Sequence, residues 1–236
     1  MTFIIRQPTP ILNTPHFHKV FGESLPFDEK KLVRELEMIA LPEMVFEVVH
    51  QEEKGIFQVR SDDYPSFPLY LDGRAGEFSS KKRSREKRLP EMELILERMR
   101  AKVGVSYVWG GNYSLGISEW LKWYPPQKKL TPFEEIHWTF RGVDCSGLLY
   151  EATDGFTPRN TSELMTFGEE ISLRDVKPLD MILYPGHLII ALNKEEVIES
   201  NHDKGGVIIS SMERRLSEIK KPFIIRRFHP DAFQIL

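Results

Sequence analysis

The chain has 236 residues, of which 41% are hydrophobic and 28% charged, a composition ordinary for a globular protein of one large or two small domains. The balance of 32 lysines and arginines against 35 aspartates and glutamates gives a net charge of −3, which excludes a global electrostatic attraction to nucleic acid or to an anionic membrane. A single cysteine excludes an internal disulfide.

The N-terminal residues, Met1 to Pro8, lack the basic region and long apolar core of a signal peptide. No stretch of the sequence approaches the length of a membrane span. We therefore expect a cytoplasmic protein with no membrane span, while the sequence leaves a leaderless export route open.

Residues 1–88 contain many prolines and aromatic residues and several short β-type runs. The runs 45–49 and 55–59 are β-branched or aromatic and flank a polar stretch, which predicts a hairpin. Over residues 28–40, apolar residues at helical spacing predict a short helix. Together these patterns predict a small β-barrel-like domain over residues 1–88.

Residues 79–88 carry six basic side chains and one acidic side chain. One interpretation is a nucleic-acid or targeting patch, and another is a segment that attracts a polycarboxylate substrate. Because no aromatic residues are interleaved and the chain as a whole is slightly acidic, we favour a solvated linker at the end of the N-terminal domain.

A helix is predicted to start at Pro90 and to stop before Gly104, because proline fits the first helical position and glycine the position just past the end. Its apolar residues share one face: Met92, Ile95, Leu96, Met99 and Val103. The segment 113–140 is unusually aromatic, with helical patterns over 117–124 and 132–140. Plain core and an insertion that forms a cleft wall are equally good interpretations of it.

The only cysteine, Cys145, follows a glycine and Asp144 and precedes a helical apolar pattern that ends at Gly155. This pattern places the thiol in the first turn of a helix, where unpaired backbone N–H groups and the macrodipole favour a thiolate. Thiolates attack carbonyl carbons, so Cys145 is a candidate nucleophile.

After Pro178 the pattern becomes strand-like, with short loops that predict an antiparallel sheet. Residues 212–219 are the exception and predict a helical connection. The predicted strands cover residues 180–184, 187–192, 196–200, 207–210 and 223–228. The fold class is therefore α+β, with a cysteine-bearing helix packed on an antiparallel sheet over residues 89–236.

A cysteine nucleophile needs a base, and the base needs a partner that orients it. His187 follows a turn and opens an apolar strand, so it is the best placed of the seven histidines. If residues 187–192 and 196–200 form a hairpin, strand alternation brings Glu199 beside His187. Asn201 and His202, just beyond the strand end, are rivals for the orienting position.

Other chemistries find little support. Ser146 lacks the preceding glycine of a nucleophile elbow, and Trp109-Gly110-Gly111 lacks the lysine and hydroxyl residue of a phosphate loop. His16 and His18 form a weak two-ligand pattern that is more typical of a strand with two polar residues on one face. We therefore predict neither a metal site nor a cofactor.

Several motifs in a fixed order resemble the NlpC family of papain-like cysteine peptidases, over residues 89–228. The motifs are Tyr107-x-Trp109-Gly110-Gly111, Asp144-Cys145-Ser146-Gly147, Pro158-Arg159-Asn160-Thr161-Ser162 and the Gly186-His187 pair that leads a strand. The resemblance implies a papain-like catalytic domain. Members also carry bacterial Src-homology-3-like domains before the catalytic domain, which the β-rich residues 1–88 resemble.

The resemblance implies hydrolysis of peptidoglycan stem peptides or muropeptides at the bond from γ-D-glutamate to meso-diaminopimelate, through a thioester acyl-enzyme. Cys145 would be the nucleophile, His187 the base and Glu199 the orienting residue. Tyr107 and Trp109 would belong to the substrate-binding site. By the same resemblance, Asp144 would bind the α-amine of the substrate and Ser146 would contact the substrate.

Two departures stand out: the family commonly has histidine where this chain has Glu199, and the 113–140 insertion is atypical. Two alternatives stay open, a catalytically silent module that binds cell-wall fragments and an acyl- or peptidyl-transferase that uses the same thioester. The sequence also leaves open whether the substrate is intact sacculus, lipid-linked precursor or recycled free peptide.

Overall fold

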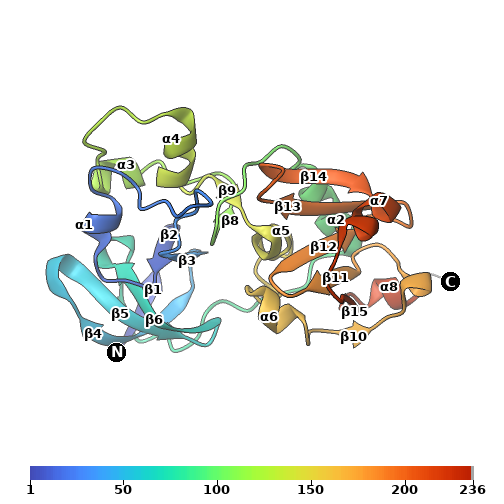
Figure 1. Ribbon diagram of the computed structural model, residues 1–236. Coiled ribbons are helices and arrows are strands. Elements are labelled where there is room, and N and C mark those ends of the chain that lie inside the picture. Colours follow the sequence, from blue (N-terminus) through green and yellow to red (C-terminus); the bar gives the residue numbers. More distant parts are fainter. Residues whose placement is uncertain (235–236) are drawn as a thin grey trace. The chain divides into compact units, whose positions relative to one another are not determined.

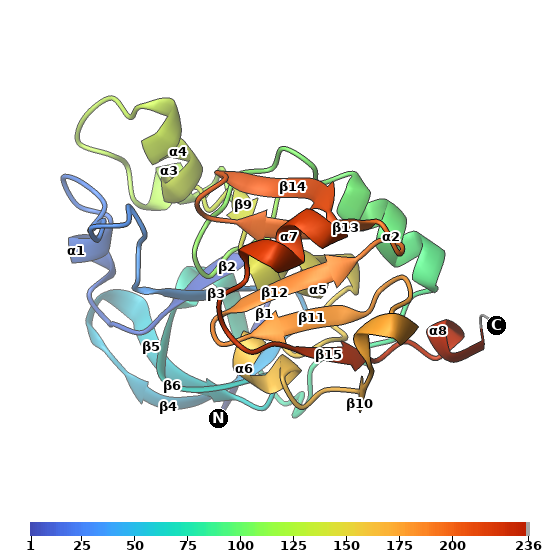
Figure 2. The same ribbon diagram turned by 45° about the vertical axis from the view of Figure 1, so that its right-hand side comes forward.

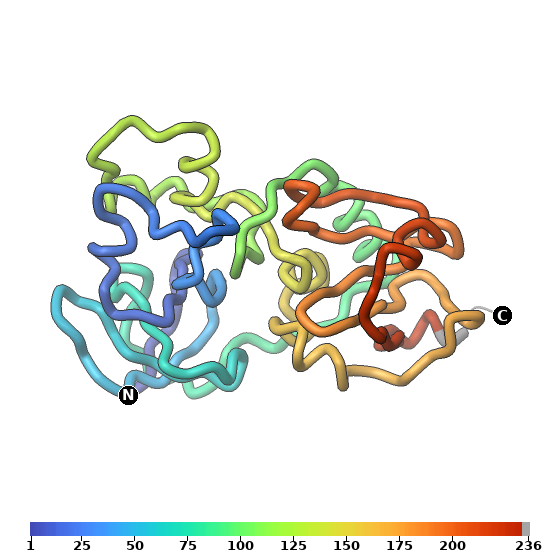
Figure 3. The backbone as a smooth tube through the Cα atoms, in the orientation of Figure 1, coloured from blue at the N-terminus to red at the C-terminus, as the bar shows by residue number. Residues whose placement is uncertain are grey.

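The computed structural model describes residues 1–234, which form two compact units. The first unit consists of residues 1–86 and 108–142, and the second of residues 87–107 and the chain from Val143 onward. The backbone therefore passes from the first unit to the second, returns, and passes over again (Figure 3). The first crossing lies close to the predicted boundary after residue 88, whereas the return over residues 108–142 differs from the predicted division.

The first unit is built on a seven-stranded antiparallel sheet of order β3-β2-β6-β5-β4-β1-β7 (Figure 1). Its strands are β1 (Thr2–Ile5), β2 (Thr9–Leu12), β3 (Leu36–Ala40), β4 (Val45–Gln51), β5 (Ile56–Ser61), β6 (Tyr64–Asp72) and β7 (Gly76–Ser79). Its other elements are helices α1 (Phe17–Val20), α3 (Trp120–Trp123) and α4 (Pro132–Trp138), the short strand β8 (Asn112–Tyr113) and the single 3-10 turns at Glu53–Gly55 and Gly73–Ala75.

The predicted hairpin is confirmed, because β4 and β5 pair antiparallel. The predicted barrel is not confirmed. The strand order ends at β3 on one side and β7 on the other, and no pairing within residues 1–234 joins these two edges. The sheet is therefore open, and the resemblance of this region to a Src-homology-3 domain is not confirmed either.

The helix predicted over residues 28–40 is wrong. Asp28 instead forms a turn, since its Oδ1 accepts hydrogen bonds from the backbone N–H groups of Lys30 and Leu32, at 2.8 and 2.9 Å. Such a side-chain acceptor competes with helical hydrogen bonding. Leu36 and Ile39, two of the apolar residues at helical spacing, are instead buried in β3, which pairs with β2.

The aromatic segment contributes to the core of the first unit, which is one of its two interpretations. Trp120, Tyr124, Trp138 and Phe140 are almost wholly buried. Their rings pack edge-on or tilted around Phe21, with centroids 5.3 to 5.9 Å away. The two helical patches predicted in this segment correspond to α3 and α4. Burial of these large rings against the N-terminal region explains why residues 108–142 fold with it.

The second unit is a six-stranded antiparallel sheet of order β10-β15-β11-β12-β13-β14 with helices on both faces (Figure 2). Its strands are β10 (Glu169–Glu170), β11 (Met181–Tyr184), β12 (His187–Ala191), β13 (Glu196–Asn201), β14 (Gly206–Ser211) and β15 (Ile224–Arg227). Its helices are α2 (Met92–Arg100), α5 (Cys145–Ala152), α6 (Thr161–Leu164), α7 (Met212–Glu218) and α8 (Asp231–Gln234), with a 3-10 turn at Leu173–Asp175. Strand β9 (Gly142–Val143) lies where the chain enters this unit for the second time.

Strand alternation divides the apolar side chains of this sheet between two layers. In β12, Leu188 and Ile190 pack with α2 and α5, whereas Ile189 and Ala191 pack with α7 on the opposite face. The predicted cysteine helix on an antiparallel sheet is therefore confirmed. The helix predicted from Pro90 is α2, but it ends at Arg100, so Val103 lies beyond it and is exposed.

Within the described residues, the helices are all too short or too polar to cross a membrane.

Candidate active site

Cys145 is the first residue of α5, as the sequence predicts, and its side chain is largely buried. Asp144 caps the helix, because its Oδ1 accepts a hydrogen bond from the backbone N–H of Gly147 at 2.7 Å. The Cys145 Sγ lies 3.8 Å from the Oγ1 of Thr161, which begins α6. The hydroxyl of Ser200 donates to the backbone carbonyl of Val143 at 2.7 Å, which ties β13 to the chain just before the cysteine.

Arg159 binds the capping residue and is itself buried. Its Nη1 donates to Asp144 Oδ1 at 3.0 Å and to Ser146 Oγ at 2.9 Å, and its Nη2 donates to Asp144 Oδ2 at 2.7 Å. The Ser146 hydroxyl donates to Asp144 Oδ1 at 3.1 Å. Both Asp144 oxygens are thus engaged within the protein, so the structure gives Asp144 and Ser146 a part in holding the start of α5. Their implied contacts with substrate stay a prediction.

His187 opens β12 directly after Gly186, whose φ of +88° is a left-handed conformation that favours glycine. Its Nε2 lies 2.5 Å from Glu199 Oε2. The side chain of His187 also interacts with that of Cys145, which is one cause of the raised pKa of His187. Since Nε2 faces Glu199, the ring nitrogen that serves Cys145 is Nδ1. Burial lowers the pKa of His187, but the hydrogen bonds with Cys145 and Glu199 outweigh it and raise that pKa to about 9.

Glu199 meets His187 through the hairpin that the sequence predicts. Strands β12 and β13 pair Ile190 with Ile198 and Ala191 with Val197, and this register places Glu199 diagonal to His187 on the same face. The Glu199 side chain is fully buried. Burial alone would raise the pKa of Glu199, whereas hydrogen bonds with His187 and Arg215 lower it to about 2.

Three further residues contact this pair, and the sequence predicted none of them as a partner of Glu199. Arg215, on α7, donates to Glu199 Oε1 from Nε at 2.5 Å and to Oε2 from Nη2 at 3.1 Å. The same Nη2 donates to the hydroxyl of Tyr184 at 2.9 Å, and the Tyr184 ring lies 5.3 Å from that of His187. Asn201, which the sequence offers only as a rival to Glu199, donates to Glu199 Oε2 at 3.0 Å.

One signal for Arg215 was present in the sequence. Met212, Arg215 and Leu216 share one face of α7 by their spacing, and Met212 and Arg215 are both buried. An arginine on the apolar face of a helix needs an acidic partner, although spacing alone does not say which one.

The other rival, His202, takes a different place. Its ring packs edge-on against Tyr107, with centroids 5.4 Å apart, and its Nδ1 lies 3.1 Å from Asp203 Oδ1. The backbone N–H of Tyr107 donates to the carbonyl of Gly205 at 3.1 Å, so Tyr107 is fixed to the β13–β14 turn that carries His202.

Trp109 belongs to the first unit, where the guanidinium of Arg34 lies over its ring at 4.1 Å from the centroid. The substrate-binding role that the resemblance implies for Trp109 stays a prediction.

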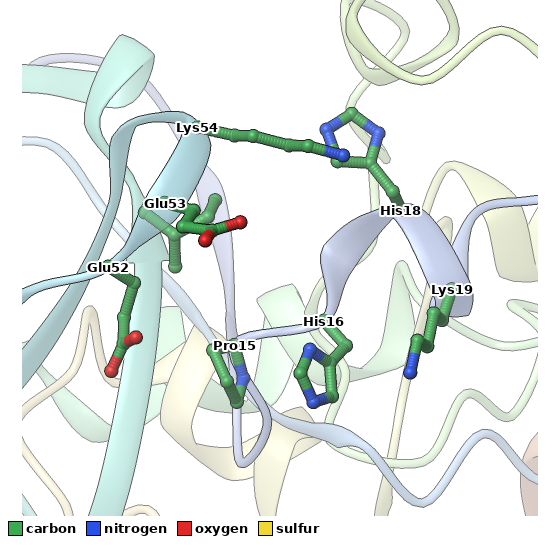
Figure 4. Close-up of a pocket in the computed structure, with 8 residues that line it drawn as sticks. Pro15, His16, His18, Lys19, Glu52, Glu53 and Lys54 are labelled. Atoms are coloured by element: carbon green, nitrogen blue, oxygen red, sulfur yellow. The ribbon is translucent and has the colours of Figure 1, made fainter.

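His16 and His18 line a separate pocket of about 460 Å³ in the first unit (Figure 4). They lie at the start of α1 and within it, so the strand expected for them is wrong. The pocket is lined by both acidic and basic side chains, including Glu53 and Lys54. Burial and the nearby charge of Lys54 lower the pKa of His18. Among residues 1–234, no group of three histidine, cysteine or acidic side chains is arranged to hold a metal ion.

No family model matches the chain, and no curated protein matches it. Solved structures that resemble it include the peptidoglycan hydrolase RipB from Mycobacterium tuberculosis, at 23% identity and a TM-score of 0.42 over 58% of this chain and 63% of that one. An NlpC/P60 family protein from Bacillus cereus is 16% identical, with a TM-score of 0.44 over 97% of this chain and 64% of that one.

RipD from Mycobacterium tuberculosis, a non-catalytic NlpC/p60 domain protein, is 19% identical, with a TM-score of 0.41 over 57% of this chain and 95% of that one. The chain thus spans less than two thirds of the RipB and Bacillus cereus structures. The Bacillus cereus protein and RipD belong to the NlpC/P60 family, which is the family that the sequence motifs resemble.

Proposed function

We propose that this chain is a cysteine peptidase that hydrolyses peptidoglycan stem peptides between γ-D-glutamate and meso-diaminopimelate. The observation that carries the proposal is the chain of contacts from Cys145 to His187 to Glu199. It joins the chain's only thiol, at a helix start, to a histidine that is oriented by a buried carboxylate. This is the arrangement that a nucleophile, a base and an orienting group require.

In the first step, the Cys145 thiolate attacks the γ-carbonyl carbon of the glutamate. The N–H of Cys145 is one of those at a helix start that have no carbonyl partner within the helix, so we assign it to the oxyanion. His187, as imidazolium, gives its Nδ1 proton to the departing amine of the diamino acid, and the C–N bond breaks to leave a thioester.

In the second step, neutral His187 takes a proton from water, and the resulting hydroxide attacks the thioester carbonyl. The C–S bond breaks and releases the Cys145 thiolate and the γ-carboxylic acid of the glutamate, which then loses its proton to solvent. Glu199 stays ionised throughout, since its role is to hold the imidazole and to stabilise the imidazolium.

The substrate assignment rests on the motifs around Tyr107, Cys145 and His187 and on their resemblance to NlpC peptidases. The structure supports the thiol chemistry independently of that assignment. A thioester can also pass to an amine instead of to water, so transfer is the second candidate function. Intact thiol and base contacts argue against a third candidate, a silent binding module.

The test is mass spectrometry of L-Ala-γ-D-Glu-meso-diaminopimelate after incubation with the parent and with Cys145→Ala. Release of L-Ala-D-Glu by the parent alone supports both the substrate and the nucleophile. A parallel reaction with an added amine distinguishes hydrolysis from transfer, because transfer adds the mass of the amine to the acyl product. A peptide that binds and stays intact with the parent would favour the binding module.

A further inference from the structure

The Glu199 carboxylate is buried between two cationic partners, His187 on one side and Arg215 on the other. Oε2 faces His187 at 2.5 Å and Arg215 Nη2 at 3.1 Å, while Oε1 accepts from Arg215 Nε at 2.5 Å. The side chains of Glu199 and Arg215 are 0% and 11% exposed. A buried carboxylate is expensive unless partners compensate for its charge and satisfy its oxygens.

The charges around the thiol balance only when Arg215 is counted. In the reactive form, the negative charge of the Cys145 thiolate and the positive charge of the His187 imidazolium cancel. With the Glu199 carboxylate, the three side chains have a total charge of minus one. The Arg215 guanidinium brings this total to zero. Where the resembling family commonly has a histidine, which can be neutral, this chain has a carboxylate that requires a counter-charge.

Asp144 and Arg159, at the start of the cysteine helix, cancel each other. Glu218, whose Oε2 lies 3.8 Å from Arg215 Nη1, is partly exposed, so water screens its charge.

Arg215 also fixes the geometry around the base. From α7, its Nε donates to Oε1 of Glu199 and its Nη2 donates to Oε2. These two hydrogen bonds hold the carboxylate so that Oε2 also faces His187 Nε2. Its Nη2 also holds the hydroxyl of Tyr184, whose ring lies beside that of His187. A planar guanidinium can make such a two-point contact, whereas the ammonium of lysine is a single point charge.

We propose that Arg215 is a positioning residue for the cysteine–histidine pair, which orients the Glu199 carboxylate toward His187 and supplies the counter-charge for it. The inference deepens the proposed function, on which its catalytic meaning rests. The alternative is a salt bridge that only stabilises the packing of α7 on the sheet. The two differ in what happens to the reactivity of Cys145.

The experiment is alkylation of Cys145 by iodoacetamide as a function of pH, which needs no peptide substrate. Because the chain has one cysteine, the rate reports this thiol alone. Arg215→Met removes a positive charge beside the group formed by Cys145, His187 and Glu199. The protons of this group are therefore held more tightly. The pH profile of alkylation should move to higher pH.

Arg215→Lys keeps the charge and loses the two-point contact. Its profile should stay where the parent's is, while its rate of peptide hydrolysis falls at unchanged KM. Arg214→Met is the matched control, because Arg214 is the neighbouring residue of α7 and its side chain is 76% exposed. It shares the partner Glu218 with Arg215, at 3.5 and 3.8 Å, but among residues 1–234 it forms no ion pair with Glu199. This control should match the parent in both assays.

Should Arg215→Met fail to fold, the double variant Glu199→Gln with Arg215→Met removes both charges and avoids an uncompensated buried ion. It should fold, and at the high-pH plateau of the alkylation profile it should react at the same rate as Glu199→Gln, since without a carboxylate Arg215 no longer orients Glu199 toward His187. A further loss in the double variant, or a parental alkylation profile in folded Arg215→Met, would overturn the proposal. A shifted profile without peptide cleavage would keep the role of Arg215 and reject the proposed substrate.

Discussion

Replacement of Arg159 by methionine tests how the start of the cysteine helix is held. The Arg159 side chain is 2% exposed and that of Asp144 is 12% exposed, and three hydrogen bonds join Arg159 to Asp144 and Ser146. Methionine fills similar volume without the charge. Asp144 would then keep only part of its partners, the backbone N–H of Gly147 and the hydroxyl of Ser146 among them.

Removal of one partner from a buried ion pair costs about 3–5 kcal/mol. Asp144 remains partly exposed and keeps its capping hydrogen bond. We therefore expect Arg159→Met to lower the free energy of unfolding by about 3 kcal/mol, the lower end of this range. Adding Asp144→Asn should recover part of this loss, since asparagine keeps the capping acceptor but no longer carries an unpaired charge. The double variant should therefore be less destabilised than Arg159→Met alone.

The assay must report on the second unit. All four tryptophans lie within residues 108–142 of the first unit, so their fluorescence follows that unit. Amide hydrogen exchange of α5, measured by mass spectrometry across a denaturant series, reports on the second. Arg174→Met is the control, because its side chain is 87% exposed. If Arg159→Met lowers the stability of α5 by less than about 1 kcal/mol, as expected for an exposed ion pair, the Arg159–Asp144 pair does not hold the start of the helix as argued.

Three further predictions concern the base, the orienting residue and the aromatic core. The pKa of His187 is raised to about 9, so its contribution to stability is complete below its ordinary pKa of 6.5 and is lost as pH rises through about 9. The free energy of unfolding should fall over that pH range. The same fall in the His187→Gln variant would show that His187 is not its cause. Glu199→Ala should slow hydrolysis by about 10⁴-fold and His202→Ala should slow it far less. A larger loss of kcat in His202→Ala than in Glu199→Ala would assign the orienting role to His202. Trp120→Ala should destabilise the first unit by about 3–5 kcal/mol, and an equal effect on α5 exchange would argue against the division into units.

Much of the second unit follows from local sequence patterns. The five strands and the helix predicted after residue 178 correspond to β11 through β15 and α7. Cys145 begins a helix because the capping acid and the apolar spacing lie within a few residues of it. His187 and Glu199 meet because a short hairpin connects them, and strand alternation then fixes which side chains share a face.

The first unit shows where local patterns fail. Apolar residues over 28–40 satisfy a helical spacing, yet the Asp28 turn and the pairing of β3 with β2 decide the outcome. A spacing of apolar residues states that they will be buried, but the partner that buries them chooses between helix and strand. The same limit explains why the open sheet was expected to close.

The tertiary structure alone decided which distant residues complete the site and the core. Arg215 reaches Glu199 because α7 packs on the sheet face that carries the carboxylate, and Arg159 reaches Asp144 across the loop that follows α5. The aromatic residues 108–142 join the first unit because their rings find partners there. Buried charges and large rings require partners, and the sequence states that requirement, whereas the packing of elements far apart in the chain determines which residues meet it.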